Sequence, residues 1–283
     1  MQIFKEKQPL IDTLLSYKSA GEIVGLVPTM GALHDGHLSL VQQALQECDR
    51  VVVSIFVNPT QFDNPKDLEM YPRTLDQDIE LLKQAQDDII VFAPNANELY
   101  GKKVASEHFD FQGLEKVMEG KYRNAHFDGV GTVIKLFFTI IKPDKAFFGE
   151  KDFQQLQIIR KLTEILELPV EIVGCPILRE ESGLARSSRN ERLSSLHREK
   201  AAFIYETLIK SKQLFGTKSA DYVTEWVKNE FQNYPFLKLE YFEIADIQNL
   251  KRVNRKREGA QYRAFIAAYA DDIRLIDNMP LNN

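Results

Sequence analysis

The sequence predicts an α/β protein with a doubly wound, Rossmann-like parallel sheet and a second, smaller α+β C-terminal domain. Short apolar runs rich in β-branched residues alternate with helix-period segments through the first two thirds of the chain, which favours a parallel sheet covered by helices. Near residue 177 the alternation ends, and helical segments precede runs typical of antiparallel strands. We therefore expect one domain over residues 1–176 and a smaller one over residues 177–283.

The first domain opens with a predicted βαβ unit. Glu22–Pro28 has the composition of a strand, and His37–Asp49 carries its apolar residues at helical spacing. Arg50–Asn58 is an almost continuous apolar run, typical of a strand buried on both faces. The remaining elements predicted here are a helix over Thr74–Gln86, a strand over Asp88–Pro94, a helix over Gly129–Pro143, a strand over Lys145–Glu150, a helix over Asp152–Leu168 and a strand over Val170–Pro176.

A polar, charged stretch, Arg179–Ser194, leads into the second domain. The elements predicted after it are helices over about Ser195–Leu214 and Ala220–Tyr234, then strands over Leu237–Ala245 and Tyr262–Asp277. Helices followed by such strands indicate a small α+β domain.

The composition narrows the class of protein. Of 283 residues, 44% are hydrophobic, which is enough for a sizeable core. Lys and Arg number 36 and Asp and Glu number 41, and the net charge of −5 disfavours bulk affinity for nucleic acid or an acidic membrane. The two cysteines suggest neither a metal site nor a disulfide framework. Because the chain shows neither a signal-peptide core nor the ~18 apolar residues of a membrane span, we expect a cytoplasmic protein.

The segment "PTMGALHDGH", Pro28–His37, stands where the first predicted strand turns into a helix. Ligands of open parallel sheets bind at such carboxyl ends of strands, and helix N-termini favour anions. Gly36 would let a phosphate approach the backbone, and His34 and His37 could bond its oxygens. The alternatives are that a histidine caps the helix, or that the pair binds zinc with Asp35, although helical zinc pairs usually sit at i, i+4.

Four longer blocks narrow this choice: "VPTMGALHDGH", "SIFVNPTQFDNPKDLEMYPRTLDQD", "FFGEKDFQQLQIIR" and "SSRNERLS". The first contains the HxGH signature of the nucleotidyltransferase and class I aminoacyl-tRNA synthetase superfamily. Together they resemble the pantothenate synthetase (pantoate–β-alanine ligase) family, from about residue 20 to the closing "RLIDNM". In isolation, "NPTQ" and "GEKD" would be ordinary turns and "ARSSRN" a solvated loop.

The resemblance implies an ATP-dependent ligase. In that reaction the carboxylate of pantoate attacks the α-phosphorus of ATP and releases pyrophosphate; the amine of β-alanine then attacks the adenylate and releases AMP, leaving pantothenate. Mg²⁺ is expected with ATP, because it neutralises phosphate charge. The resemblance also implies a homodimer, a nucleotide-binding catalytic first domain and a lid formed by the second.

The resemblance carries roles onto particular residues. His37 corresponds to the proton donor, and His34, Lys151 and Arg189 are further catalytic candidates. The residues expected to bind ATP are Met30, Gly31, Ala32, Leu33, His34, Asp35, Gly36, His37, Gly149, Glu150, Lys151, Asp152, Leu178, Arg186, Ser187, Ser188 and Arg189. Arg186 departs from the family, where an uncharged residue is usual, so the role of its side chain stays open.

Gln61 is expected to bind both pantoate and β-alanine, and Gln155 to bind pantoate. A neutral amide both donates and accepts, and therefore binds a hydroxy acid without repelling its carboxylate. Asp78 is the candidate protein ligand of Mg²⁺, ahead of Asp76, although both could simply be dipole partners of a helix start. Arg123 and His126 could approach the pantoate pocket.

Two rival functions remain at the level of sequence. A nucleotidyltransferase that keeps the nucleotide on its product would share HxGH without needing Gln61 and Gln155 together. A non-catalytic nucleotide-binding module would bind ATP and release no pyrophosphate with any acid, yet simple binding does not require the histidine pair, Lys151 and Arg189.

Overall fold

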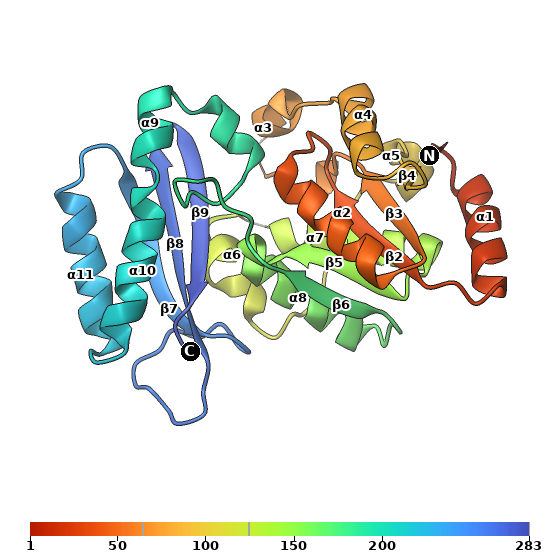
Figure 1. Ribbon diagram of the computed structural model, residues 1–283. Coiled ribbons are helices and arrows are strands. Elements are labelled where there is room, and N and C mark those ends of the chain that lie inside the picture. Colours follow the sequence, from red (N-terminus) through yellow and green to blue (C-terminus); the bar gives the residue numbers. More distant parts are fainter. Residues whose placement is uncertain (64, 124, 283) are drawn as a thin grey trace. The chain divides into compact units, whose positions relative to one another are not determined.

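A computed structural model of the chain describes residues 1–63, 65–123 and 125–282 (Figure 1). The chain forms two compact units. Unit 1 comprises Met1–Glu115, Glu119–Glu150 and Gln155–Pro176, and unit 2 comprises Lys116–Met118, Lys151–Gln154 and the chain from Ile177 onward. The segment around Lys151 is therefore part of unit 2, although it lies between two segments of unit 1 in the sequence.

The helices and strands follow one another along the chain, and Figure 1 labels those for which there is room. Up to Pro176 they are β1 (Gln2–Phe4), α1 (Lys7–Ser19), β2 (Val24–Thr29), α2 (Asp35–Glu47), β3 (Arg50–Ile55), α3 (Pro65–Met70), α4 (Leu75–Ala85), β4 (Ile90–Phe92), α5 (Ala96–Tyr100), α6 (Met118–Tyr122), α7 (His126–Ile141), β5 (Lys145–Gly149), α8 (Phe153–Ile165) and β6 (Glu171–Cys175). After Pro176 they are α9 (Ser195–Lys200), α10 (Phe203–Phe215), α11 (Ala220–Gln232), β7 (Lys238–Asp246), β8 (Tyr262–Ala270) and β9 (Ile273–Pro280).

Unit 1 is built on a parallel sheet. Within the described residues, six strands pair in the order β1-β4-β3-β2-β5-β6, and every pairing is parallel. The strand order reverses direction at β2, whose neighbours are β3 and β5. This is the switch point at which open α/β sheets bind ligands, so the segments that follow β2 and β5 occupy the expected binding edge.

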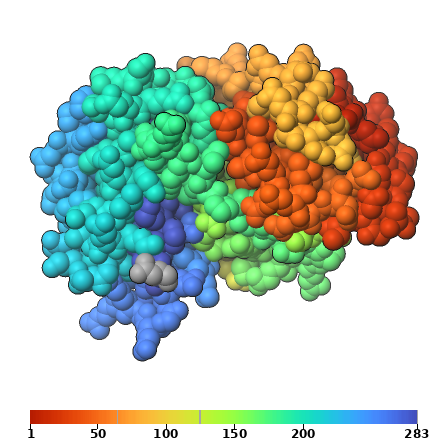
Figure 2. Space-filling view, in the orientation of Figure 1, coloured from red at the N-terminus to blue at the C-terminus, as the bar shows by residue number. Residues whose placement is uncertain are grey.

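Helices cover both faces of this sheet, because the crossovers to either side of β2 run in opposite directions. On one face α2 and α4 contact each other and lie side by side (Figures 1 and 2), whereas α1 contacts α7. The core beneath α2 joins Val41 and Ala44 to the buried strand residues Val27, Val53 and Phe147. Burial of these apolar side chains, at about 25 cal/mol per Å², fixes the helices over the sheet.

Unit 2 contains an antiparallel sheet, and among the described residues its strand order is β7-β8-β9. The helices α10 and α11 contact this sheet and each other (Figure 1). Their inward side chains, such as Leu208 and Val227, pack with Ile244, Ile266 and Leu275 of the strands. The predicted doubly wound parallel sheet and small α+β part are thus confirmed as fold classes.

The N-terminal strand β1 and the helix α1 were not predicted from the sequence. β1 pairs with β4 at one edge of the parallel sheet, through Gln2–Ile90, Ile3–Val91 and Phe4–Phe92. A strand of three residues is too short to show an alternating pattern, and α1 buries only Leu10 and Leu14. Asp88–Pro94 is accordingly the fourth strand of the chain, where the sequence predicted the third.

Two predictions for the C-terminal part were wrong. The helix expected over Ser195–Leu214 is two helices, because the backbone bonds after α9 tighten to the i−3 carbonyl, as from Ile204 to Ala201. The strand expected over Tyr262–Asp277 is a hairpin of β8 and β9. Asp271, with φ of 52°, opens a two-residue turn there, and aspartate is one of the residues that tolerate this backbone region.

None of the helices in the described part of the chain is both long and apolar enough to span a membrane.

Candidate active site

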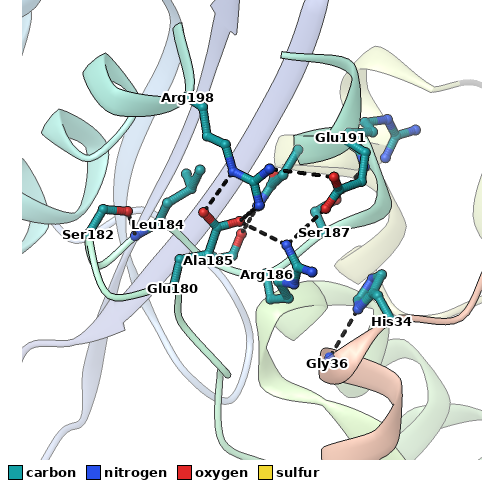
Figure 3. Close-up of polar contacts among 12 residues, drawn as sticks. His34, Gly36, Glu180, Ser182, Leu184, Ala185, Arg186, Ser187, Glu191 and Arg198 are labelled. Carbon is teal, nitrogen blue, oxygen red and sulfur yellow. Dashed lines mark hydrogen bonds and ion pairs between the residues drawn. The ribbon is translucent and has the colours of Figure 1, made fainter. Parts of the chain in front are cut away.

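The HDGH segment forms a tight turn between β2 and α2. His34 is the N-cap of α2 and its Nδ1 accepts a hydrogen bond of 3.0 Å from the backbone N–H of Gly36 (Figure 3). In return, the backbone N–H of His34 donates to Nδ1 of His37 over 3.3 Å. The two histidines therefore form a reciprocal capping box, in which each imidazole has the place usually taken by Ser, Thr, Glu or Gln.

This capping arrangement assigns the tautomers of both imidazoles. Because Nδ1 accepts a hydrogen bond in His34 and in His37, a neutral ring carries its proton on Nε2. The ring centroids lie 4.1 Å apart, and both side chains are partly exposed. Two Nε2–H donors at the N-terminus of a helix suit a negatively charged oxygen. The capping and phosphate interpretations are thus compatible.

Asp78 holds the loop that precedes His34. It lies in the first turn of α4 and is only 2% exposed. Its Oδ1 accepts from the backbone N–H of Leu33 over 2.8 Å, and its Oδ2 from that of Ala32 over 3.1 Å. Thr74 Oγ1 donates to the same Oδ1 over 3.2 Å. The prediction that Asp78 binds Mg²⁺ is not tested by these contacts, but they give both carboxylate oxygens another task.

Gln61 is buried beside the HDGH loop. It ends a short 3₁₀ helix, Pro59–Gln61, and is 8% exposed. Its amide donates to Sδ of Met30 over 2.8 Å, and its Oε1 accepts from Nδ2 of Asn58 over 3.0 Å. His126, buried at the start of α7, contacts the carbonyl of Gln61 through Nδ1 at 2.9 Å. Unit 1 thus places Gln61 against Met30, the first residue predicted to bind ATP, and His126 contacts the backbone of Gln61.

A glycine lets α7 approach this loop. A Cβ on Gly129 would stand 2.4 Å from the carbonyl oxygen of Thr60, a distance that real Cβ atoms do not adopt. The carbonyl of Gly129 also accepts from Nδ2 of Asn58 over 3.1 Å. Any side chain at position 129 would therefore push the helix away from the segment that carries Gln61.

The "GEKD" block divides between the two units. Gly149 ends β5 in unit 1, whereas Lys151 belongs to unit 2, where its backbone carbonyl accepts from Nδ2 of Asn278 over 2.8 Å. The Lys151 side chain is 18% exposed, and its Nζ lies 3.9 Å from Asp152 Oδ2. Gln155 is partly exposed in α8.

Leu178 and Arg186 become neighbours in unit 2. They face each other across a small hairpin, in which the backbone N–H of Arg186 donates to the carbonyl of Leu178 over 2.9 Å. Next to this pair, Arg179 bridges to Ala185 and its guanidinium forms two bonds to the buried carboxylate of Asp277, at 2.6 and 3.0 Å. Two residues predicted separately to bind ATP are thus joined by one backbone hydrogen bond.

Glu180 gathers the cationic side chains of this region (Figure 3). Its Oε1 accepts from Arg186, Asn190 and Arg198 at 3.1, 2.8 and 3.0 Å, and its Oε2 from Nε of Arg198 at 3.0 Å. The carboxylate of Glu191 accepts hydrogen bonds from the same two arginines, from Arg186 at 3.0 Å and from Arg198 at 3.4 Å. Partial burial raises the pKa of Glu180, but the bonds from Arg198, Asn190 and Arg186 outweigh it and hold the pKa below its ordinary value.

The serines and Arg189 form the exposed end of the same loop. Ser187 caps the 3₁₀ helix Ser188–Arg192 by accepting from the backbone N–H of Arg189 over 3.3 Å. Arg189 is exposed, and the described residues show no ion pair for it. A hydroxyl pair and an available guanidinium are suitable groups for a polyphosphate.

Neither a cysteine nucleophile nor a metal site is supported by the described residues. Cys48 and Cys175 are free, and burial raises the pKa of their thiols to about 11 and about 12, so both stay protonated at neutral pH. Across residues 1–63, 65–123 and 125–282, no three His, Cys, Asp or Glu side chains stand together in a way that could hold a metal ion. The zinc interpretation of His34, Asp35 and His37 gains no support.

Sequence reasoning missed two supporting residues and gave a third, Asp78, a different role. Asn58 precedes the "PTQ" turn and bonds Gln61, while Glu180 organises the arginines of unit 2. Asp78 was considered only as a metal ligand or a dipole partner. The clue for Asn58 was its place inside a quoted motif; the other two contacts join residues that no local pattern relates.

Comparison with known proteins agrees with the geometry. A family model described as pantoate-beta-alanine ligase matches residues 2–280. The pantothenate synthetase of Christiangramia forsetii is 68% identical over 283 residues, covering 100% of both chains, and that of Flavobacterium psychrophilum is 54% identical over 280 residues, covering 99% of both.

Solved structures give the same answer. Pantothenate synthetase from Thermus thermophilus superposes with a TM-score of 0.90 at 37% identity, covering 100% of both chains. Pantoate-beta-alanine ligase from Francisella tularensis, complexed with β-γ ATP and β-alanine, has a TM-score of 0.81 at 34% identity, covering 100% of this chain and 98% of that one. The chain belongs to the pantoate–β-alanine ligase family.

Proposed function

We propose that this chain condenses (R)-pantoate with β-alanine to give pantothenate, using ATP and passing through pantoyl adenylate. The observation that carries the proposal is the paired imidazole turn at the switch point of the sheet, His34 to His37, with both Nδ1 atoms engaged by the backbone. Family membership over the whole chain supports the substrates.

In the first step the pantoate carboxylate attacks the α-phosphorus of ATP. A bond forms between a carboxylate oxygen and that phosphorus, the bond to the bridging oxygen breaks, and pyrophosphate leaves. We propose that His34 and His37 stabilise the charge that develops on the phosphoryl oxygens, with His37 as proton donor. The residues that bind the polyphosphate in this scheme are Lys151, Ser187, Ser188 and Arg189. Catalysis then rests on positioning and charge stabilisation.

In the second step the amine of β-alanine attacks the acyl carbon, AMP leaves and the amine gives up its proton. We assign Gln61 to both acids, because its amide is held in place by Met30 and Asn58, and Gln155 to pantoate. We further propose that residues 177–283 act as a lid, since an acyl adenylate hydrolyses unless water is excluded.

Mg²⁺ fits this scheme as a companion of ATP. The described residues offer no preformed group of three metal ligands, and the oxygens of Asp78 accept hydrogen bonds from the loop. We therefore propose that phosphate oxygens and water supply most of its ligands, and that it neutralises phosphate charge. The homodimer and the cytoplasmic location stay predictions; sedimentation of the purified chain tests the first.

Pyrophosphate release tests the function. The chain is incubated with ATP, Mg²⁺ and D-pantoate, with and without β-alanine, while pyrophosphate and AMP are measured. We expect a single turnover of pyrophosphate without β-alanine, and multiple turnover with equal AMP once it is added. Multiple-turnover pyrophosphate that leaves the nucleotide on the product would favour a nucleotidyltransferase, and ATP binding without any release would favour a binding module.

A further inference from the structure

We propose that Asp78 is a positioning residue, whose carboxylate holds the backbone of Ala32 and Leu33 so that His34 and His37 face ATP. The inference rests on the proposed function, because it names what sets the geometry of the imidazole pair. It gives Asp78 a role distinct from that of a magnesium ligand.

The geometry of the carboxylate supports this role. Each oxygen of Asp78 takes one backbone N–H of the loop, from Leu33 at 2.8 Å and from Ala32 at 3.1 Å. Thr74, one helical turn earlier, orients the carboxylate by donating to Oδ1 over 3.2 Å. The side chain is almost completely buried, so water does not compete well for these bonds.

The loop needs an external hold because its backbone is unfavourable. Gly31 has φ of 78° and Ala32 has φ of 50°, two successive residues in the left-handed region. Glycine adopts this region freely, but alanine places its Cβ too close to the following carbonyl. The bonds to Asp78 select this conformation over extended alternatives, and they do so before any ligand arrives.

The loop leads directly into the catalytic pair. Leu33 is followed by His34, the N-cap, and His37 is fixed to His34 through the capping box. A shift at Ala32–Leu33 therefore moves both imidazoles together. Since a misplacement of about 1 Å can cost about 10²-fold in rate, the carboxylate would act on chemistry without touching substrate.

An ordinary helix-dipole role does not account for these contacts. Asp76, in the same first turn of α4, is exposed and supplies the acidic charge that a helix start favours. Asp78 instead points its two oxygens at amides 45 and 46 positions away in the chain. Asp76 is therefore a matched control: same residue type, same turn, different surroundings.

Hydrogen exchange of the ligand-free chain tests the contact itself. In the wild type the amides of Ala32 and Leu33 should be protected, and in Asp78→Asn they should exchange about 10-fold faster or more, because one amide loses its acceptor. Asp76→Asn should leave both unchanged. Thr74→Val, which keeps the carboxylate and removes only its orienting hydroxyl, should give a smaller change in the same direction.

Kinetics then separates positioning from metal binding. Asp78→Asn should lower the rate of adenylate formation at saturating ATP by about 10- to 100-fold, while the Mg²⁺ concentration for half-maximal rate shifts by less than about 2-fold. Unchanged amide exchange together with a rate restored by high Mg²⁺ would overturn the proposal in favour of a metal ligand. If Asp78→Asn does not fold, Thr74→Val carries both readouts, and unchanged exchange and rate in it would equally overturn the proposal. Because exchange is measured without substrates, a wrong assignment of the reaction would leave that result intact.

Discussion

Two loops predicted to bind the ATP phosphates are each organised by one acidic side chain, but in different ways. In unit 1, Asp78 accepts hydrogen bonds from the backbone of Ala32 and Leu33, the loop that leads into HDGH. In unit 2, Glu180 accepts them from the side chains of Arg186, Asn190 and Arg198. The first carboxylate binds backbone amides, whereas the second binds side chains, including the buried Asn190.

The difference suggests different mobility. Asp78 is 2% exposed, so releasing Ala32 and Leu33 would leave this buried carboxylate without its backbone partners. The Glu180 side chain is 16% exposed and its companion Glu191 60%, so water can replace their partners at a lower cost. We infer a preformed imidazole turn in unit 1 and adaptable arginine side chains in unit 2.

The largest effect should come from the rigid loop. His37→Ala should slow adenylate formation by about 10²-fold or more while ATP still binds, as expected for a contact made mainly in the transition state. Single-turnover pyrophosphate release measures the rate, and equilibrium binding measures ATP affinity. His108→Ala, at a residue whose side chain is 85% exposed, is the control and should have no effect. A normal single-turnover rate in His37→Ala would remove it from the chemistry.

The contribution of Glu180 should appear in the stability of unit 2. Glu180→Gln should lower the free energy of unfolding of unit 2 by about 1–3 kcal/mol, because the buried Asn190 amide and two partly exposed arginines lose a charged acceptor. Glu191→Gln should cost less than about 1 kcal/mol, since its side chain is mostly exposed. The only tryptophan of the chain, Trp226, packs against the core of unit 2, so its fluorescence during urea unfolding follows that unit.

The effect of Glu180→Gln has a defined pH dependence. The pKa of Glu180 is lowered in the folded chain, so its contribution is complete above the unfolded value of about 4.3 and is lost as pH falls through the folded value. The difference in unfolding free energy between the wild type and Glu180→Gln should therefore shrink between pH 7 and pH 3. A difference that grows on acidification would contradict the assignment of the lowered pKa.

The contrast also explains what the sequence could predict. Alternating apolar runs report burial directly, so they placed the parallel sheet, and the HDGH motif could be recognised because its residues are consecutive in the chain. Neither acid could be found this way. Asp78 acts on residues 45 and 46 positions away and Glu180 on one 18 positions away, and such contacts exist only after folding. Elements with few inward residues, such as β1, escaped for the related reason that three residues show no period.

An intermediate effect is expected at Gln61, a predicted substrate contact whose amide bonds Met30. Gln61→Ala should raise the KM for pantoate by about 10-fold, the equivalent of one good hydrogen bond, with little change in the KM for ATP. The reason is that the buried amide is held between Met30 and Asn58 and cannot be replaced by water in the same geometry. Steady-state kinetics with each substrate varied in turn measures this. A change confined to ATP would mean that Gln61 acts only through Met30.

The smallest effect should come from Arg186, in spite of its charge. Its guanidinium is already held by Glu180 and Glu191, while its backbone N–H donates to Leu178 whatever the side chain is. Arg186→Met should therefore change the KM for ATP by less than about 3-fold. Arg189→Met, in the same loop but at an exposed residue, should raise it by about 10-fold or more, because a phosphate contact would be lost. If Arg186→Met raised the KM for ATP as much as Arg189→Met, Arg186 would leave the carboxylate of Glu180 when ATP binds. Its guanidinium would then bind a phosphate group of the nucleotide instead.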